Sequence, residues 1–66
     1  MYRNGQNLTE DLHFQDHLEH EVPIQIYLGV NHKDIGFVEQ YSGIFIKVNN
    51  TFYRRDYFTF ISRPGY

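Results

Sequence analysis

Residues 44 to 55 read IFIKVNNTFYRR, and this stretch has the pattern of a β-hairpin. Every second residue from Ile44 to Val48 is apolar, as expected for a strand with one buried face. Asn49 and Asn50 follow, and asparagine tolerates the positive φ angles that a two-residue hairpin turn requires. We therefore expect two antiparallel strands joined by a tight turn.

The same alternation extends on both sides of this hairpin. It predicts strands at residues 24–30, 35–41, 44–48, 51–55 and 57–62. A turn-rich NHKD segment separates the first two strands, and Gly36 inside the second strand indicates a bend or bulge. Five short, strongly bent strands hide their edges best by curling into a small barrel.

A helix is expected before the strands, because the period of the apolar residues is 3.6 ahead of Pro23 and 2 after it. Asn7 is suited to be its N-cap, with Glu10 placed to reach back to the cap amide. One apolar stripe falls within about 160° of the helical wheel and consists of Leu8, Leu12, Phe14, Leu18 and Val22. Pro23 ends the helix, because the residue before a proline is pushed towards extended geometry.

These elements predict a single domain at residues 1–66. Its parts are a flexible end at 1–6, an α-helix at 7–21, a β-barrel at 24–62 and a tail at 63–66. The expected fold class is mainly β, with an N-terminal α-helix followed by a five-stranded, strongly bent antiparallel sheet or small barrel.

Size and composition exclude several classes of protein. A chain of 66 residues buries only roughly 60% of the surface that its unfolded form exposes, so self-association is plausible. The absence of cysteine excludes disulfides and thiolate sites. The first residues lack the apolar run of a signal peptide, and nowhere do about 18 apolar residues follow one another. We therefore expect a cytoplasmic protein with no membrane partner.

The charges are unevenly distributed along the chain. The formal net charge of −2 gives no general reason to expect a polyanionic partner. Up to Pro23 there are one basic and five acidic residues, whereas from Ile24 onwards there are five basic and three acidic residues. An acidic leader of net charge −4 thus precedes a body of net charge +2.

The order of a helix and five bent strands resembles the Sm and Sm-like family. That family carries a glycine in a bent second strand, then an aromatic residue and an aspartate, and an asparagine in the third strand. Gly36 and Tyr41 match the glycine and the aromatic residue, whereas Ser42 and Ile46 stand at the aspartate and the asparagine. The resemblance covers residues 8–62 and implies an SH3-like barrel capped by a helix.

The second motif of that family is an apolar residue followed by Arg-Gly. Tyr53 and Arg54 meet its first two positions, and Arg55 stands where glycine belongs. In the family the asparagine contacts a base and the Arg-Gly pair closes the nucleotide pocket, so the resemblance implies the Sm-like fold more than that activity. The chain is also similar to small uncharacterised proteins of Bacillus-type spore-forming bacteria that end in an SRPGY-like tail.

Three histidines form the first candidate site. On the helical wheel His13, His17 and His20 lie opposite the apolar stripe, near Glu10 and Glu21. Imidazoles at i and i+4 can bind Zn²⁺, Ni²⁺ or Cu²⁺, but an exposed helix face offers few groups to fix such ligands. The favoured interpretation is a solvated face; a weak metal site or a pH-responsive contact is the alternative.

A basic and aromatic patch forms the second candidate site. Arginines interleaved with aromatic side chains can bind phosphates and stack bases. The residues that such a nucleic-acid site would use are Lys47, Tyr53, Arg54, Arg55 and Tyr57. Barrel core with charged edge residues is the favoured interpretation, a protein-facing interface the next, and RNA or DNA binding the third.

Catalysis has little support in the sequence. No nucleophile elbow, phosphate-binding glycine loop or zinc-protease motif is present, and His32 is expected to decorate a turn. We therefore expect a non-enzymatic protein without cofactors that acts through protein contacts, as a homo-oligomer or with an unknown protein partner. Pairing of strand edges between copies would bury surface that one short chain leaves exposed.

Overall fold

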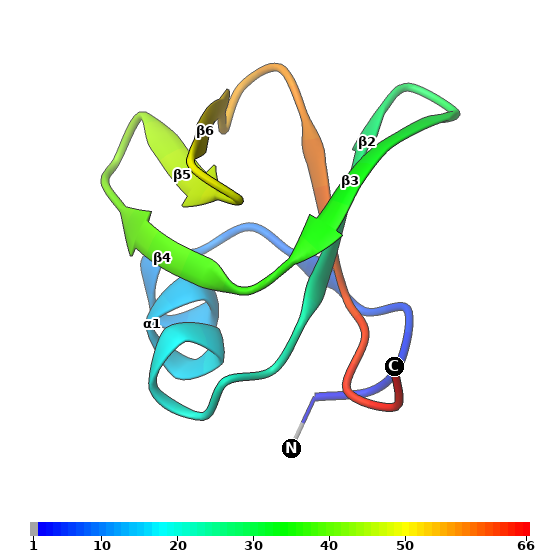
Figure 1. Cartoon of the computed structure of the whole chain (residues 1–66), viewed down its shortest axis with the longest axis vertical. Helices are drawn as coiled ribbons and strands as arrows, with labels where there is room; N and C mark the ends of the chain where they lie inside the picture. The colour runs from blue at the N-terminus through cyan, green and yellow to red at the C-terminus, as the bar shows by residue number, and fades with distance from the viewer. Residues whose placement is uncertain (1) are drawn as a thin grey trace.

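Residues 2–66 are described by the computed structural model, in which they form one helix and seven short strands (Figure 1). The elements are β1 (Asn7–Leu8), α1 (Asp11–Glu19), β2 (Ile24–Leu28), β3 (Asn31–Gly36), β4 (Val38–Tyr41), β5 (Phe45–Val48), β6 (Thr51–Arg54) and β7 (Thr59–Ser62). They form a four-stranded antiparallel sheet in the order β1-β7-β2-β3 and a three-stranded antiparallel sheet in the order β4-β5-β6. The expected mainly β fold with one helix is confirmed.

The expected closed barrel is wrong, and so is the count of five strands. Among residues 2–66 no strand pairing joins the two sheets. The strand predicted at 35–41 begins earlier and breaks at Phe37, so that β3 lies in one sheet and β4 in the other. Figure 1 shows the chain changing direction between these two strands.

The break follows from a close approach between Gly36 and the turn of the β5–β6 hairpin. A Cβ atom at Gly36 would lie 2.9 Å from Nδ2 of Asn49 and 3.0 Å from Cγ1 of Val48, so only glycine fits without a shift. The Asn49 amide donates to Oδ1 of Asp34 at 2.9 Å and to the carbonyl oxygen of Ile35 at 3.0 Å. One side chain thus ties the hairpin turn to β3, across the two sheets.

The predicted β5–β6 hairpin is confirmed. Asn49 and Asn50 have φ angles of 50° and 62°, which mark a tight turn, and Val48 pairs with Thr51 on either side of it. Ile44, however, lies before β5 and is 67% exposed, although its parity predicted burial. The hydroxyl oxygen of Ser42 accepts the amide of Ile44 at 3.1 Å, which forms a local turn there.

The first hairpin turns two residues earlier than the sequence predicted. Gly29 and Val30 make the turn, with a φ of +61° at Gly29, and the NHKD segment belongs to β3. Val30 is consequently 93% exposed instead of buried. The register also shifts between Ile26 and Tyr27, so simple alternation does not hold along the whole strand.

The core lies between the sheets and the helix. Its buried apolar residues are Leu8, Phe14, Ile24, Ile26, Val38, Ile46, Val48 and Phe60. Phe14 of α1 packs edge-on against Phe60 of β7 with ring centroids 5.4 Å apart. Tyr41 of β4 donates its hydroxyl proton to Oε1 of Gln15 at 2.7 Å, which fixes α1 to the three-stranded sheet as well.

The helix is shorter than the predicted range 7–21, because the residues before it pair with a strand. Leu8 lies opposite Phe60 in the β1–β7 ladder, and Glu10 in place of Asn7 is the N-cap. Leu12, expected on the buried stripe, is 65% exposed. No helix within residues 2–66 is long and apolar enough to cross a membrane.

The flexible end predicted at residues 1–6 lies partly outside the described residues, and its described part forms hydrogen bonds with β7. The amide of Gly5 donates to the carbonyl oxygen of Ser62 at 2.8 Å, and the Ser62 amide donates to the carbonyl oxygen of Gln6 at 2.8 Å. Together with β1, these residues run along the outer edge of β7. We call residues 2–8 the N-terminal arm. The arm covers the β7 edge.

We expect Gly36→Ala to lower the free energy of unfolding by about 1–3 kcal/mol, because its Cβ would overpack against Asn49 and Val48. Gly43→Ala is the matched control, since a Cβ at Gly43 meets no atom within 4 Å, and its change should stay within about 0.5 kcal/mol. Chemical denaturation of both variants measures the difference. Equal stabilities would contradict the role given to the close approach at Gly36.

Candidate functional site

The most polar part of the interior is a pair of completely buried side chains, His17 of α1 and Ser62 of β7. Nδ1 of His17 lies 2.6 Å from the carbonyl oxygen of His13, which can only accept, so Nδ1 carries the proton. Nε2 of the neutral ring therefore accepts the hydroxyl proton of Ser62 at 2.7 Å. Both nitrogens of His17 are satisfied inside the core.

Burial keeps His17 uncharged. Loss of hydration on burial lowers its pKa below the usual 6.5, although the hydrogen bond to the carbonyl oxygen of His13 acts in the opposite direction. A serine bonded to a neutral imidazole has the geometry of a nucleophile and its base. Because neither side chain is exposed, no substrate can reach the Ser62 hydroxyl in this fold, and the pair is structural.

Tyr2 of the N-terminal arm packs over this pair. Its ring centroid lies 4.4 Å from that of His17, and its hydroxyl donates to Oδ2 of Asp16 at 2.6 Å. Burial, and then this carboxylate, raise the pKa of Tyr2 to about 12, so the hydroxyl remains a donor at neutral pH. No sequence pattern predicts this contact, because Tyr2 lies in the segment that is expected to be flexible.

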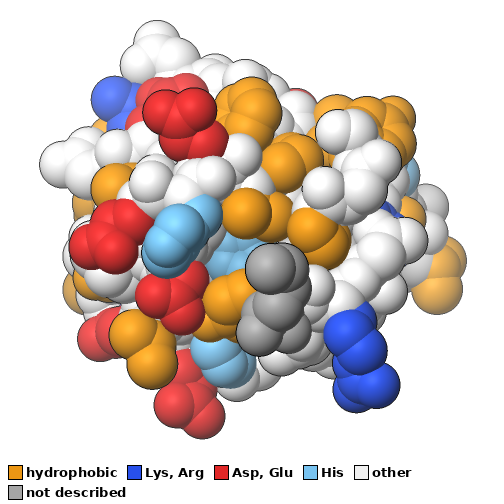
Figure 2. Space-filling view, turned by 90° about the horizontal axis from the view of Figure 1, so that it is seen from below, with side chains coloured by type: hydrophobic (Ala, Val, Ile, Leu, Met, Phe, Trp, Pro, Cys, Tyr) orange, Lys and Arg blue, Asp and Glu red, His pale blue; other side chains and the backbone are white. Residues whose placement is uncertain are grey.

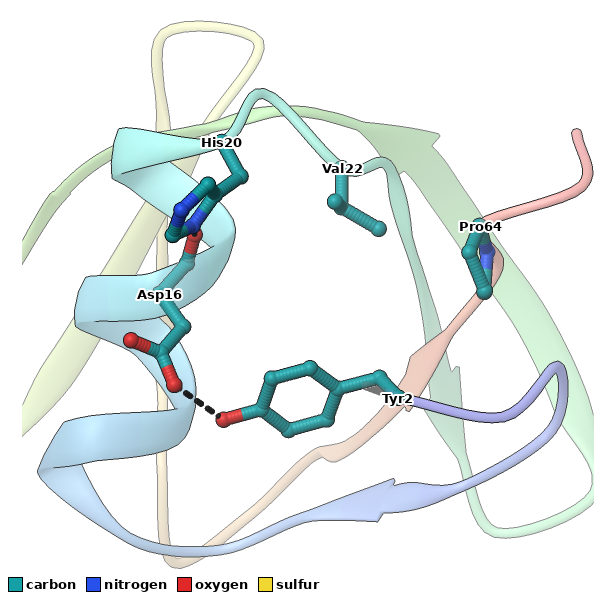
Figure 3. A pocket seen from close by; sticks show the side chains of 5 residues that line it. All are labelled: Tyr2, Asp16, His20, Val22 and Pro64. Atoms are coloured by element: carbon teal, nitrogen blue, oxygen red, sulfur yellow. Dashed lines mark hydrogen bonds between the residues drawn. The ribbon is translucent and has the colours of Figure 1, made fainter.

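A shallow pocket of about 370 Å³ lies beside this contact (Figure 3). Its lining consists of Tyr2, Asp16, His20, Val22 and Pro64. In Figure 3 the Asp16 and His20 side chains stand on the helix side, and Pro64 lies on the opposite side. Figure 2 shows acidic and histidine side chains gathered on one side of the face seen from below.

The three histidines of the first candidate site do not share one solvated face. His17 is buried, and Nδ1 of His13 accepts the amides of Thr9 at 2.9 Å and Glu10 at 3.1 Å, which caps the helix. His20 alone of the three is exposed. The wheel placed His17 wrongly because it could not show the partner that β7 supplies.

A different group of side chains comes within reach of a common ion. Ligand atoms of Asp16, Glu19 and His20 lie within 4.8 Å of one another on the last turn of α1. These side chains are largely exposed, and hydrogen bonds already use Oδ2 of Asp16 and Oε2 of Glu19. Nothing in the chemistry of the group selects a metal over water.

The five basic and aromatic residues of the second candidate site are also dispersed. Tyr53 turns inwards and donates to Oδ2 of Asp34 at 2.7 Å, and its burial and then that carboxylate raise its pKa to about 12. Arg54 pairs with Asp56 at 2.8 Å, and Tyr57 is 70% exposed. They do not converge on one surface.

Arg55 is a structural clamp. Its guanidinium donates to Oδ1 of Asp11 at 2.5 Å, to the carbonyl oxygen of Ser42 at 2.6 Å and to that of Thr9 at 3.1 Å. The same group lies 4.9 Å from the ring centroid of Phe14. Arg55, which directly follows β6, thus joins the start of α1 to the β4–β5 turn and is not available to a ligand.

Lys47 and Arg54 remain, and they share one surface with two aromatic rings. In the β5–β6 ladder Phe45 lies opposite Arg54, and Lys47 lies opposite Phe52. The two rings pack edge to face at 4.7 Å, and the Lys47 ammonium lies 5.3 Å from the Phe52 centroid. We call Phe45, Lys47, Phe52 and Arg54 the outer platform. Its two phenylalanines are not among the candidate residues predicted from the sequence, although the Asn49-Asn50 turn sets their register.

An open strand edge adjoins the outer platform. β6 is the last strand of its sheet, whereas β7, the next strand along the chain, has β1 on one side and β2 on the other. Phe52 on β6 is 55% exposed. Backbone groups at such an edge are ready to pair with another strand.

Comparisons with known proteins found no relative. No protein-family model, no curated protein and no solved structure matches the chain.

The buried histidine makes stability depend on pH. Its lowered pKa means that, below pH 6.5, the unfolded chain binds more protons than the folded chain, so stability is present above that pH and is lost on acidification. We expect the free energy of unfolding to fall by up to about 1.4 kcal/mol per pH unit through this group. Urea unfolding between pH 7.5 and 5 measures the slope.

The double substitution His17→Phe with Ser62→Ala removes both partners and leaves no unpaired side chain. This variant should lose the acid-dependent slope, whereas His20→Gln, at an exposed position, should keep it. A slope that follows His20 instead of His17 would contradict the assignment.

Proposed function

We propose that the chain is a non-enzymatic protein-contact module that works through the outer platform and the open edge of β6. The observation that carries this proposal is the pair Phe45 and Phe52, which form an aromatic surface directly beside an unpaired strand edge. Aromatic side chains next to a free edge are suited to strand addition, in which backbone hydrogen bonds supply affinity and side-chain contacts supply specificity.

The arrangement of polar groups supports this proposal over an enzyme. Ser62 and His17 are buried, Asp34 is bonded to Tyr53 and Asn49, and Arg55 is used by the fold. The side chains that could act in catalysis thus serve the structure, whereas Phe45 and Phe52 of the outer platform lie at the surface beside a strand edge. We further propose that the two sheets and the helix are a variant of the Sm-like or SH3-like fold in which the sheets do not close into a barrel, in a bacterial cytoplasmic protein.

A photo-crosslinking amino acid at Phe52 tests the contact function in the native cells of the protein. We expect discrete adducts with a protein partner, either another copy or a different chain. Val30 is the matched control, because it is apolar and 93% exposed but lies on the hairpin of the other sheet. Equal crosslinking from Val30 and Phe52, or none from either, would contradict the proposal.

Single-stranded nucleic acid is a second candidate partner, because Lys47 and Arg54 stand beside the two rings of the outer platform. Bases could stack on Phe45 and Phe52 while the cations meet phosphates. Arg54 is already paired with Asp56, so the electrostatic contribution would be small.

Anisotropy of a labelled single strand tests this second function at low salt. We expect binding that weakens as salt rises and is reduced by both Lys47→Ala and Phe52→Ala, because one supplies charge and the other stacking. Lys33→Ala, on β3 of the other sheet, is the control and should bind like the parent. No signal at low salt, or equal losses in all three variants, would remove nucleic acid from consideration.

A further inference from the structure

Resting on the proposed contact function, we propose that the partner of the β6 edge is a second copy of the same chain. The two β6 strands would run antiparallel about a two-fold axis that passes between the Phe52 residues. The two three-stranded sheets would then join into one six-stranded sheet.

The turn geometry identifies the backbone groups that are free at this edge. A two-residue turn makes Val48 and Thr51 a hydrogen-bonded pair, and hydrogen-bonded and non-bonded pairs then alternate along the antiparallel ladder. Phe52 is opposite Lys47 in a non-bonded pair, so its amide and carbonyl point away from β5. The backbone of Arg54 points in the same direction.

One register uses these free groups best. The carbonyl oxygen of Arg54 already accepts the amides of Tyr57 at 3.2 Å and Phe58 at 3.1 Å, so it is a poor partner for an incoming strand. With Phe52 opposite its own copy, each Phe52 amide donates to the carbonyl of the other Phe52. The occupied Arg54 carbonyl then faces only the Asn50 amide of the second copy, which already donates to Oε2 of Glu39 in its own chain at 3.2 Å. The Arg54 amide faces the Asn50 carbonyl of the second copy.

The alternative two-fold axis at Tyr53 fits less well. It would place the Phe52 amide opposite the Arg54 carbonyl, which the β6–β7 turn already occupies. The free donors and acceptors of β6 are therefore self-complementary in the Phe52 register, which is the property that a two-fold interface requires.

The side chains of the outer platform agree with this pairing. The row across the joined sheet would read Lys47, Phe52, then Phe52 and Lys47 of the second copy, with an aromatic pair at the axis. The two Arg54 side chains would lie about 14 Å apart, beyond the screening length of about 10 Å at 0.1 M salt. Charged side chains on an edge strand normally disfavour pairing with another strand. Here the charge of each Arg54 is offset by its ion pair with Asp56.

The rest of the fold directs pairing to β6. The N-terminal arm covers the outer edge of β7, held by hydrogen bonds of Gly5 and Gln6 to Ser62 and by β1. β4 is packed against α1, where Tyr41 bonds to Gln15. The edge of β6 carries no such cover among residues 2–66.

Sedimentation equilibrium of the purified chain and two Phe52 variants tests the proposal. The parent should dimerise, Phe52→Ala should dimerise more weakly, and Phe52→Pro should weaken the dimer at least about tenfold further, since each proline removes one inter-chain donor. Because the Phe52 amide points away from β5, the proline removes no hydrogen bond of the chain's own ladder, and circular dichroism should remain unchanged.

Disulfide trapping provides a test that does not depend on the proline variant folding. The chain has no cysteine, so Phe52→Cys and the control Val30→Cys each introduce a single thiol. Phe52→Cys should crosslink to a dimer under mild oxidation much faster than Val30→Cys. Equal rates, or a purified parent that remains monomeric at high micromolar concentration, would overturn the self-pairing. A monomer whose Phe52 photo-crosslinker still captures another protein would leave the contact function standing and the self-pairing refuted.

Discussion

The fold depends on the close approach of the Asn49 side chain to Gly36. This contact requires a residue without a Cβ at the end of β3, and it lets one amide bond both Asp34 and the Ile35 carbonyl. The chain bends there, and the strands after the bend form a sheet of their own. An open β6 edge is a consequence, because the chain divides its strands between two sheets instead of closing one.

Local sequence signals predicted the parts of the fold that depend on neighbours in the chain. The Asn49-Asn50 turn and the alternation before it need only two positive φ angles and one buried face, and the hairpin was found where it was expected. The bend at Gly36 is also a local signal, because a glycine inside a strand often marks a bend or bulge. The full separation into two sheets depends on Asn49, which lies 13 residues further along the chain.

Long-range partners explain what the sequence could not predict. A helical wheel places His17 on a solvated face, because an imidazole counts as polar. Its burial is possible because Ser62, 45 residues away, forms a hydrogen bond with it. The alternation of arginine and aromatic residues makes Arg55 a candidate for nucleic-acid binding, the third interpretation of that segment, yet three acceptors from distant segments occupy its guanidinium. In both cases the sequence identifies a residue with functional chemistry, but it does not show the distant residue that binds it in the fold.

The N-terminal arm covers the β7 edge of the four-stranded sheet, whereas the β6 edge of the three-stranded sheet is open. β1 pairs with β7 and covers its edge. A head-to-tail contact would pair β6 of one copy with β7 of the next. Such a contact would first have to break the hydrogen bonds between Gly5 and Ser62 and the packing of Tyr2 on His17. The proposed symmetric β6 contact would displace no strand, because β6 is the outer strand of its sheet. The heterologous contact could extend into rings or fibres, whereas the symmetric contact closes at two copies. Under the proposed self-pairing, the arm thus favours a closed pair over an open assembly.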